Sequence, residues 1–455
     1  ARLAGRTVIL TGAAGNLGRV ISQYLLREGA NVVMTGRNRE KLEAFIEELV
    51  AVGFRREAML AAIGDCALPG PCREIVASTV ERFGAFDVLV NNAGGAGPKQ
   101  TLCNIPLTDA QARAMGESET MFGAAMNLLG GPWNMARAAV PHMATGGVII
   151  NVSTIFSRTV YFGRIPYVVP KSGLNAFSLG LAKELGRGEK GIRVNTVYPG
   201  PIESERIDTV FAAMDKLQNN ETGTTSATFR DLMIAKRADD KGELGLRYPK
   251  PQDVANTILW LSSEESAAFS GQAFEITNGM DVPKQSRSKL VSWPDNRLVD
   301  LRGRAVLILG GADINEAVVF AERNRQRGAD VVVGFRSLQA VGEARSRLEQ
   351  ADGKGVQLQH FDPLRAESAD RVFQFMADHY GRLDGVIVLP ATPNGQHGYS
   401  LCTADDEDVT AFVRDEIVAP VAIAAALSHY AGVERNFPSA PVVTYVTNPD
   451  DGHGN

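Results

Sequence analysis

The chain has 455 residues, about three times the ~150 residues of a common domain, so its length favours more than one domain and an internal duplication. Hydrophobic residues make up 44% and charged residues 22%, which are ordinary values for a globular protein. The formal net charge of −5 leaves no basic excess to bind a phosphate backbone, and the composition therefore argues against nucleic-acid binding. Glycine is unusually common, with 46 residues or about 10% against a usual ~7%.

The cysteines form no CxxC pair, and the histidines form no HxxxH or HExxH arrangement. Neither a disulfide framework nor a metal site is therefore predicted. No apolar run approaches the ~18 residues of a membrane span, and the chain opens directly into a strand without the apolar region of a signal peptide. These features favour a cytoplasmic protein.

The first half alternates strands and helices. The apolar run Thr7 to Leu10 is followed by a glycine-rich turn, Thr11 to Gly18, and then by apolar residues at helical spacing until Gly29. Further strands are predicted at 31–35, 58–63, 87–90, 148–152 and 192–197, with a helix beginning near Tyr167. This alternation predicts βαβ units and an α/β fold with a Rossmann-type, doubly wound parallel sheet.

After the sixth strand, residues 203–250 become polar and contain only short helical fragments. A long insertion at this point lies at the carboxyl edge of such a sheet, where ligands bind. We interpret it as a substrate lid. The alternative is a surface elaboration or a dimer contact.

The opening pattern then repeats beyond a polar linker at 281–300. Residues 303–310 parallel 5–12 at an offset of 298, and residues 331–336 parallel 32–37 at an offset of 299. Asp362 and residues 383–388 repeat Asp65 and the strand at 87–90 in nearly the same register. We therefore predict a tandem chain, with one complete domain at 1–280 and an incomplete, degenerate second copy at 301–455.

The second copy has lost the residues that carry chemistry in the first. Gly310, Asp313 and Glu316 stand where the first copy has Gly12, Gly15 and Gly18, so carboxylates occupy the place of a bound pyrophosphate. Leu389-Pro390-Ala391-Thr392 replaces Asn91-Asn92-Ala93-Gly94. Its strand at 442–446 matches the strand at 148, and the chain stops at Asn455 before an equivalent of the helix near Tyr167.

The glycine-rich turn of the first copy is typical of a pyrophosphate-binding loop. Gly12, Gly15 and Gly18 would let the backbone approach the anion, and the following helix presents free N–H groups at its positive end. The second strand ends at Gly36-Arg37 with no acid, so a ribose 2′-phosphate would meet a guanidinium. This favours NADP over NAD, unless Arg37 is only a solvated surface residue.

Tyr167 and Lys171 are spaced by four and would share one helix face. Pro170 is tolerated best in a first turn, which places Tyr167 at the helix start and at the carboxyl edge of the sheet. A lysine cation at about 4 Å contributes up to ~4 kcal/mol at an effective dielectric constant of 20, enough to lower a phenol pKa by as much as about three units. Tyr167 is therefore a candidate general acid.

Two further polar residues stand at characteristic distances from this tyrosine, with Thr154 thirteen residues and Asn127 forty residues before it. With Thr11 to Gly18, Asn91 to Gly94 and the Tyr167–Lys171 motif, residues 3–280 resemble the short-chain dehydrogenase/reductase family. The catalytic set of that family is Asn, Ser, Tyr and Lys. Thr154 stands at the serine position here, and Ser153 or Ser157 could supply the hydroxyl instead.

The resemblance implies roles for these residues. Tyr167 would be the general acid, Lys171 would also hold the nicotinamide ribose, Thr154 would hydrogen-bond the carbonyl, and Asn127 would seat a proton-relay water. It also implies a homodimer. The cofactor-binding positions that it implies are Thr11, Gly12, Gly15, Asn16, Leu17, Gly18, Arg37, Asn38, Asp65, Asn92, Ala93, Gly94, Tyr167, Lys171, Pro199, Gly200 and Ile202.

A closer similarity rests on the runs Ile150 to Arg158, Tyr161 to Tyr167 and Pro199 to Ser204, together with the degenerate second copy. These are similar to the N-terminal part of the bifunctional malonyl-CoA reductases. That similarity implies reduction of malonate semialdehyde to 3-hydroxypropionate with NADPH, the semialdehyde coming from a separate C-terminal part that this chain lacks. The alternatives are a reductase for another 3-oxo compound, such as a 3-oxoacyl thioester, and a catalytically silent scaffold.

A substrate with a free carboxylate needs a cation near Tyr167. Arg158 and Arg164 lie just before this tyrosine, and Arg206 opens the predicted lid. Arginine suits carboxylate binding, so we expect at least one of the three to bind the substrate. The alternative is that they pair with Glu203 or Glu205.

Overall fold

The computed structural model describes residues 1–159, 161–239, 241–280, 301–311, 313–350, 355–390, 406–430 and 441–445. The predicted linker at 281–300 and the replacement residues Ala391 and Thr392 lie outside these residues. None of the helices in the described part combines the length and the apolar character that a bilayer crossing requires.

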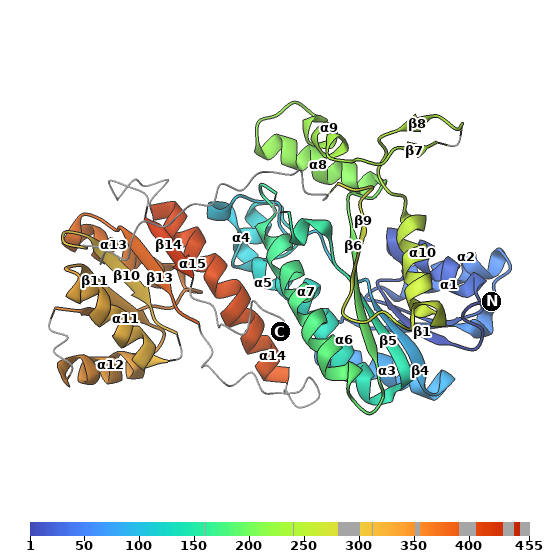
Figure 1. The fold of residues 1–455 in the computed structure, drawn as a ribbon, viewed down its shortest axis with the longest axis horizontal. Coiled ribbons are helices and arrows are strands. Elements are labelled where there is room, and N and C mark those ends of the chain that lie inside the picture. Colours follow the sequence, from blue (N-terminus) through green and yellow to red (C-terminus); the bar gives the residue numbers. More distant parts are fainter. Residues whose placement is uncertain are drawn as a thin grey trace. The chain divides into compact units, whose positions relative to one another are not determined.

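The chain divides into two compact units, and each contains its own parallel sheet (Figure 1). The first consists of Ala1–Thr101, Thr108–Lys284 and Tyr399–Thr410, and the second of Leu102–Leu107, Gln285–Gly398 and Ala411–Asn455. Residues 102–107 therefore belong to the second unit, although residues of the first unit flank them in the sequence. Residues 399–410 belong to the first unit, although residues of the second flank them. In the first unit Asp406 accepts hydrogen bonds from Arg73 at 2.9 Å and Arg137 at 2.7 Å, and in the second Cys103 Sγ lies 2.9 Å from Ser428 Oγ.

The sheet of the first unit has seven parallel strands in the order β3-β2-β1-β4-β5-β6-β9. They are β1 (Thr7–Thr11), β2 (Asn31–Gly36), β3 (Met59–Ile63), β4 (Phe86–Asn91), β5 (Met143–Val152), β6 (Arg193–Pro199) and β9 (Ala273–Ile276). The strand order reverses at β1, where Leu10 pairs with Met34 on one side and Val90 on the other. A ligand crevice is expected beyond the carboxyl ends of strands at such a point.

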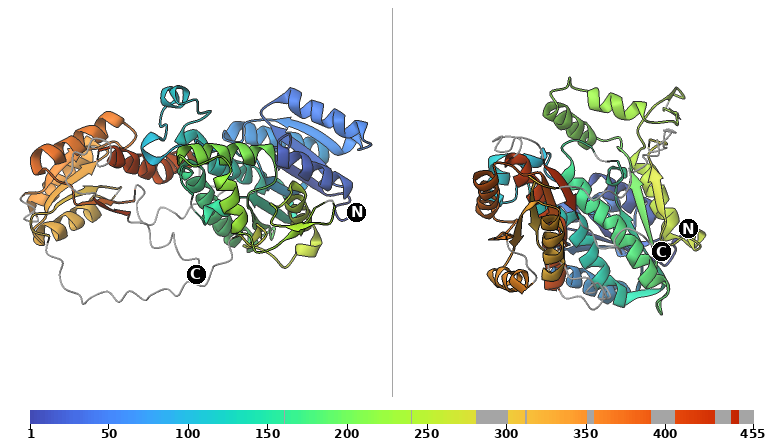
Figure 2. Two further views of the ribbon diagram at one scale, coloured as in Figure 1. Left: turned by 90° about the horizontal axis from the view of Figure 1, so that it is seen from above. Right: turned by 60° about the vertical axis from the view of Figure 1, so that its left-hand side comes forward.

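Helices cover both faces of this sheet (Figures 1 and 2). Val8 and Leu10 pack on one side with α1 (Asn16–Arg27), α2 (Arg39–Ala51) and α10 (Pro251–Ser262). Ile9 points the other way and packs with α3 (Pro69–Phe83), α6 (Gly131–Ala139) and α7 (Ile165–Gly186). Because the strands are apolar on both faces, the continuous hydrophobic runs in the sequence correctly predicted a sheet buried between two helical layers.

Several further elements of the first unit surround the carboxyl edge of the sheet. They are α4 (Asp109–Ala114), α5 (Met121–Ala125), the π-helix η3 (Met126–Gly130), the single turn η5 (Ile155–Ser157), α8 (Glu205–Leu217), α9 (Thr224–Asp231) and the hairpin β7 (Arg237–Ala238) and β8 (Leu244–Gly245). The last four lie in the insertion at 203–250, where Asp215 on α8 accepts hydrogen bonds from the backbone N–H groups of Gly223 and Thr225, both at 2.8 Å.

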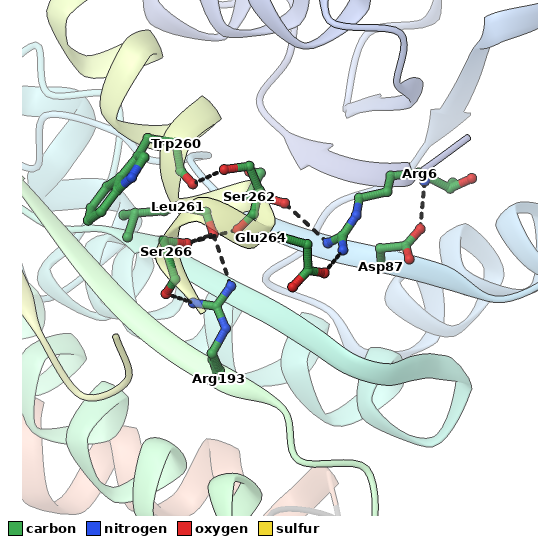
Figure 3. A network of polar contacts seen from close by, with 10 residues as sticks. Arg6, Asp87, Arg193, Trp260, Leu261, Ser262, Glu264 and Ser266 are labelled. Atoms are coloured by element: carbon green, nitrogen blue, oxygen red, sulfur yellow. Dashed lines mark hydrogen bonds and ion pairs between the residues drawn. The ribbon is translucent and has the colours of Figure 1, made fainter. Parts of the chain in front are cut away.

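A polar network holds the opposite, amino-terminal edge of the sheet (Figure 3). Arg193, the first residue of β6, donates to the carbonyl oxygens of Ser266 and Phe269 at 3.0 Å and to that of Leu261 at 3.4 Å. Asp87 on β4 accepts from the backbone N–H of Thr7 at 2.8 Å. These contacts join β1, β4 and β6 to the end of α10, away from the edge where the motif residues lie.

The second unit repeats the first five strands in the same spatial order, β12-β11-β10-β13-β14. Its elements are β10 (Ala305–Leu309), α11 (Ile314–Gln326), β11 (Asp330–Phe335), α12 (Leu338–Gln350), β12 (Gln357–His360), α13 (Ala366–Tyr380), β13 (Gly385–Val388), the π-helix η7 (Val413–Val418), α15 (Ala419–Ser428) and β14 (Val442–Tyr445). The helix α14 (Asp406–Phe412) begins in the first unit and ends in the second. Asp384 accepts from the N–H of Ala305 at 2.9 Å, as Asp87 does from Thr7. The tandem duplication predicted from the sequence offsets is thus confirmed.

Candidate active site

The turn after β1 has the shape that a bound pyrophosphate requires. Gly12 has φ +68°, a conformation that side chains oppose, and a Cβ on Gly18 would lie 2.2 Å from the carbonyl oxygen of Gly12. Gly15 is the N-cap of α1, and no side chain caps this helix. The first-turn N–H groups of Asn16, Leu17 and Gly18 therefore face the turn without a side-chain acceptor, as an anion site demands.

Thr11 joins this turn to the loop after β4. Its Oγ1 accepts hydrogen bonds from the backbone N–H groups of Asn92 at 2.9 Å and Ala93 at 2.8 Å. Asn92 in turn donates from Nδ2 to the carbonyl oxygen of Thr11 at 3.0 Å. The two motifs, 80 residues apart in the sequence, therefore form one wall of the crevice at the strand-order reversal.

The other predicted cofactor residues lie around the same edge. Asn38 caps α2 by accepting from the N–H of Lys41 at 2.8 Å, and Asp65 Oδ1 accepts from that of Ala67 at 3.0 Å. Arg37 is 72% exposed in its side chain and lies 3.9 Å from Asp65, a loose pair that leaves most of its N–H groups in solvent. Pro199 is the last residue of β6, Gly200 and Ile202 follow it, and the N–H of Gly200 donates to the carbonyl oxygen of Ile276 on β9 at 2.9 Å.

Lys171 is buried, and its Nζ donates to the carbonyl oxygen of Val152, the last residue of β5, at 2.6 Å. Burial, together with the positive charge of Arg206, lowers its pKa to about 7. Close to neutral pH only about half of the molecules therefore carry the cation on which the sequence argument for Tyr167 relies. A bound anion would raise this pKa and restore the charge.

Tyr167 is the third residue of α7, which begins at Ile165. Pro166 stands at the helix start, and Pro170 lies inside the helix rather than in its first turn. The expected position of Tyr167 is confirmed, but the reason given for it was wrong, because Pro166 and not Pro170 marks the helix start. Gly97, at φ +64°, brings the loop after β4 close to this start: a Cβ on it would lie 3.2 Å from the backbone N of Tyr167.

Asn127 lies in the π-helix η3, and its Nδ2 donates to Glu119 Oε2 at 2.7 Å. Glu119 approaches the loop after β4, since a Cβ on Gly95 would lie 2.6 Å from its Oε1. A Cβ on the neighbouring Gly94 would lie 3.9 Å from Lys171 Nζ. The loop thus brings Asn127 and Lys171 to one place. Sequence reasoning missed Glu119, which stands eight residues before Asn127 and just before Thr120, the N-cap of α5.

The three candidate hydroxyls differ in their hydrogen bonds. Ser153 donates to Asn175 Oδ1 at 2.6 Å, and Ser157 donates to the carbonyl oxygen of Thr154 at 2.6 Å while accepting from Asn175 Nδ2 at 2.7 Å. Thr154 is buried, and its only acceptor among the described residues is the carbonyl oxygen of Pro199, at 3.5 Å. Asn175 therefore occupies both serines and leaves the threonine hydroxyl the least engaged. A signal for Asn175 was present, since it follows Lys171 by four residues on the same helix face.

The three candidate arginines differ in their burial and in their partners. Arg158 pairs with Glu275 at 2.5 Å and lies 4.6 Å from the ring centroid of Tyr198. Arg164 is buried, donates from Nη2 to the carbonyl oxygen of Ala96 at 2.8 Å, and lies 4.8 Å from the ring centroid of Tyr167. Arg206 is exposed on α8, and its charge lowers the pKa of both Lys171 and Arg164.

The insertion at 203–250 packs against the Tyr167 region through an apolar cluster. Phe211 on α8 and Phe229 on α9 stack at 5.1 Å between ring centroids, and Phe229 contacts Tyr161 at 4.3 Å and Phe156 at 5.4 Å. Tyr167 itself packs against the edge of this cluster. The insertion therefore forms the apolar wall beside Tyr167.

In the second unit the equivalent cofactor crevice is closed. The side chain of Asp313 caps α11 itself, accepting from the N–H of Asn315 at 2.8 Å. Phe335 stands where the first unit has Gly36, and a Cβ on Gly310 would meet its ring at 2.5 Å. Arg336, the counterpart of Arg37, pairs with Asp415 at 2.6 Å. A carboxylate, an aromatic ring and an ion pair thus take the places that an anionic dinucleotide needs.

The described residues contain no group of three or more His, Cys, Asp or Glu side chains arranged to hold a metal ion. The described site offers a phenol, a hydroxyl, hydrogen-bond donors and cations. The glycine cradle fits a dinucleotide, and the residues around Tyr167 fit a carbonyl group.

Comparisons with known proteins agree with this site. Residues 6–215 match the short chain dehydrogenase family. The 3-oxoacyl-(acyl-carrier-protein) reductase FabG of Staphylococcus aureus (strain Mu50 / ATCC 700699) is 30% identical over 278 residues, which cover 60% of this chain and 98% of the relative. The 1,6-dihydroxycyclohexa-2,4-diene-1-carboxylate dehydrogenase of Pseudomonas putida is 28% identical over 292 residues, 64% of this chain and 98% of the relative.

Among solved structures, the N-domain of a bacterial malonyl-CoA reductase, crystallised with NADP, is 40% identical with a TM-score of 0.91 and covers 99% of this chain and 84% of that chain. The C-domain of a bacterial malonyl-CoA reductase has a TM-score of 0.70 at 16% identity over 93% of this chain and 82% of that chain, which is a likeness of fold alone. With the glycine cradle, the Tyr167–Lys171 pair and a relative at 30% identity, the chain belongs to the short-chain dehydrogenase/reductase family.

Proposed function

We propose that this protein reduces malonate semialdehyde to 3-hydroxypropionate with NADPH. The observation that carries the proposal is the likeness to the N-domain of a malonyl-CoA reductase, which extends over 99% of this chain and therefore includes the second unit. The curated relatives with other substrates match only 60–64% of the chain. The partner that supplies the semialdehyde would be a separate C-terminal part.

The residues present fit NADPH. Gly12, Gly15 and Gly18 leave room for the pyrophosphate beside the uncapped start of α1, and the exposed Arg37 offers a guanidinium to the 2′-phosphate. Lys171 would hold the nicotinamide ribose with the N–H groups that Val152 does not use. When bound, NADPH supplies the hydride, and the protein aligns and protonates the substrate.

In this scheme Tyr167 donates its phenolic proton to the carbonyl oxygen as the carbonyl becomes an alcohol. Thr154 donates a hydrogen bond to the same oxygen, because its hydroxyl is the least engaged of the three candidates. Asn127, held by Glu119, would seat the water that returns a proton to the site. The aromatic cluster of the insertion, acting as a lid, would exclude bulk water from the reacting carbonyl.

The test is NADPH oxidation by the full chain with malonate semialdehyde, with uncharged aldehydes and with a 3-oxoacyl thioester, compared with Tyr167→Phe. We expect malonate semialdehyde to be the preferred substrate and Tyr167→Phe to lower kcat by about 100-fold or more, since a positioned general acid contributes about 10²–10⁴-fold. NADPH should still bind the variant, because the glycine cradle and Arg37 are unchanged. Faster turnover of the thioester would favour the alternative function, and no turnover of any carbonyl would leave only the scaffold hypothesis.

A further inference from the structure

Arg164 is a buried cation with unused hydrogen-bond donors. Its side chain is only 2% exposed, yet Nε and Nη1 have no hydrogen-bond partner, so three of its five N–H groups are unsatisfied. Burying a charged group without partners is costly, and such groups are nearly always paired in folded proteins. An orphaned guanidinium in a site therefore indicates that a ligand completes it.

The acids around Arg164 do not fill this role. Glu117 is the nearby acid whose charge raises the pKa of Arg164, but its Oε1 accepts from the N–H of Lys99 at 3.0 Å and from Gln100 Nε2 at 2.9 Å. Burial outweighs this effect and lowers the pKa of Arg164, with the charge of Arg206 acting in the same direction. Among the described residues, no carboxylate accepts a hydrogen bond from Arg164 or from Arg206.

The position of Arg164 connects it to the reacting group. Its Nη2 anchors the loop after β4 through Ala96, and its guanidinium lies 4.8 Å from the ring centroid of Tyr167. Arg206 stands in the first turn of α8, and its charge lowers the pKa of both Arg164 and Lys171. No ion pair of Arg206 is seen among the described residues. Arg158, in contrast, is held by Glu275.

We propose that Arg164 binds the carboxylate of the substrate beside Tyr167, with Arg206 completing the anion site from the insertion. This rests on the proposed reductase function and sharpens it, because it defines the substrate class as short carbonyl compounds that carry a carboxylate. At least one carboxylate oxygen would accept from Nη1 of Arg164. The anion then satisfies the buried donors, and the distance from Arg164 to Tyr167 limits the chain between carboxylate and carbonyl to a few atoms.

The experiment compares malonate semialdehyde with propanal, which has the same number of carbons and no carboxylate, in wild type, Arg164→Gln and Arg206→Gln. Removing one partner of a buried charge pair typically costs enough to change binding by 10²-fold or more, so we expect kcat/KM of Arg164→Gln to fall by roughly 100-fold for malonate semialdehyde and by less than about 5-fold for propanal. Arg206→Gln should also lower kcat/KM for malonate semialdehyde more than for propanal, but only by roughly 10-fold, because this residue is exposed. Arg193 is a half-buried arginine at the opposite edge of the sheet, so Arg193→Gln is the matched control. It should leave kcat/KM unchanged for both aldehydes.

A binding measurement separates this proposal from the reductase function. With NADP⁺ present, 3-hydroxypropionate should raise the Tm of the wild type but not that of Arg164→Gln. If the wild type bound 3-hydroxypropionate in this way without reducing any aldehyde, the reductase function would be wrong and the anion site would stand. Equal losses of kcat/KM for both aldehydes in Arg164→Gln, with 3-hydroxypropionate still raising its Tm, would show that Arg164 only supports the loop and would overturn the proposal.

Discussion

At the scale of single residues, burial changes the chemistry of Lys171. An unfolded chain exposes this lysine to water with a pKa of 10.5, whereas burial and the charge of Arg206 lower its pKa in the folded protein to about 7. Below pH 7 both states are protonated, and the folded state carries the full cost of the buried cation. Between pH 7 and 10.5 the unfolded state binds more protons, so stability rises with pH in this window.

Lys171→Met should therefore stabilise the cofactor-free protein at pH 6. The fall from 10.5 to about 7 corresponds, at ~1.4 kcal/mol per pKa unit, to at most about 5 kcal/mol. We expect the free energy of unfolding of the variant to exceed that of the wild type at pH 6 and the difference to shrink by pH 10, as measured in urea titrations. A difference that does not change with pH would mean that Lys171 keeps an ordinary pKa.

At the scale of elements, the amino-terminal edge of the sheet depends on Arg193. This side chain donates to three carbonyl oxygens near the end of α10, at 3.0, 3.0 and 3.4 Å. Figure 3 shows the two hydrogen bonds to Leu261 and Ser266. Removing this side chain leaves those acceptors without their partner, and each unsatisfied buried group costs about 1–3 kcal/mol. The catalytic motifs lie at the other edge and should not respond.

Arg193→Met should lower the free energy of unfolding by roughly 2–3 kcal/mol and leave KM for NADPH and for the aldehyde unchanged. Arg39→Met is the control, because Arg39 forms only an exposed pair with Glu43 at a helical spacing of four, worth about 0.3–0.5 kcal/mol. Urea titration and steady-state kinetics measure the two quantities. A loss of stability no larger than that of the control would show that solvent replaces the three hydrogen bonds.

At the scale of the whole molecule, the duplication should yield one cofactor site per chain and not two. The first unit has an uncapped helix after its glycine turn and an exposed Arg37, while the second has Asp313 on its helix start, Phe335 beside Gly310 and Arg336 paired with Asp415. An anion entering the second crevice would meet a carboxylate instead of free N–H groups.

Calorimetric titration of the full chain with NADPH should therefore give a stoichiometry of one. Gly18→Val should abolish binding, because a Cβ at this position lies 2.2 Å from the carbonyl oxygen of Gly12. Arg336→Ala should leave both stoichiometry and affinity unchanged. Two equivalents bound by the wild type, or one equivalent retained by Gly18→Val, would show that the second unit still holds a cofactor.

Local patterns were enough to predict the fold class and the duplication, and they define the candidate catalytic pair. Apolar runs alternating with helical spacing define the strands and helices, and glycine turns and the Tyr167–Lys171 spacing depend only on nearby residues. The register between the copies also follows from the sequence, and the equivalent roles of Asp87 and Asp384 confirm it. Each of these features is set by neighbours within a few positions, so a linear reading suffices.

Which of several similar side chains faces the site depended on contacts between distant parts of the chain. Asn175 on α7 forms hydrogen bonds with Ser153 and Ser157 near the end of β5. Arg158 forms an ion pair with Glu275 on β9, and Arg164 donates to the carbonyl oxygen of Ala96 after β4. These partners meet only because β4, β5, β6 and β9 lie side by side with α7 packed across them. Burial and pairing, and with them the charge of Lys171 and the orphaned donors of Arg164, are properties of that packing, which residue spacing along the chain does not encode.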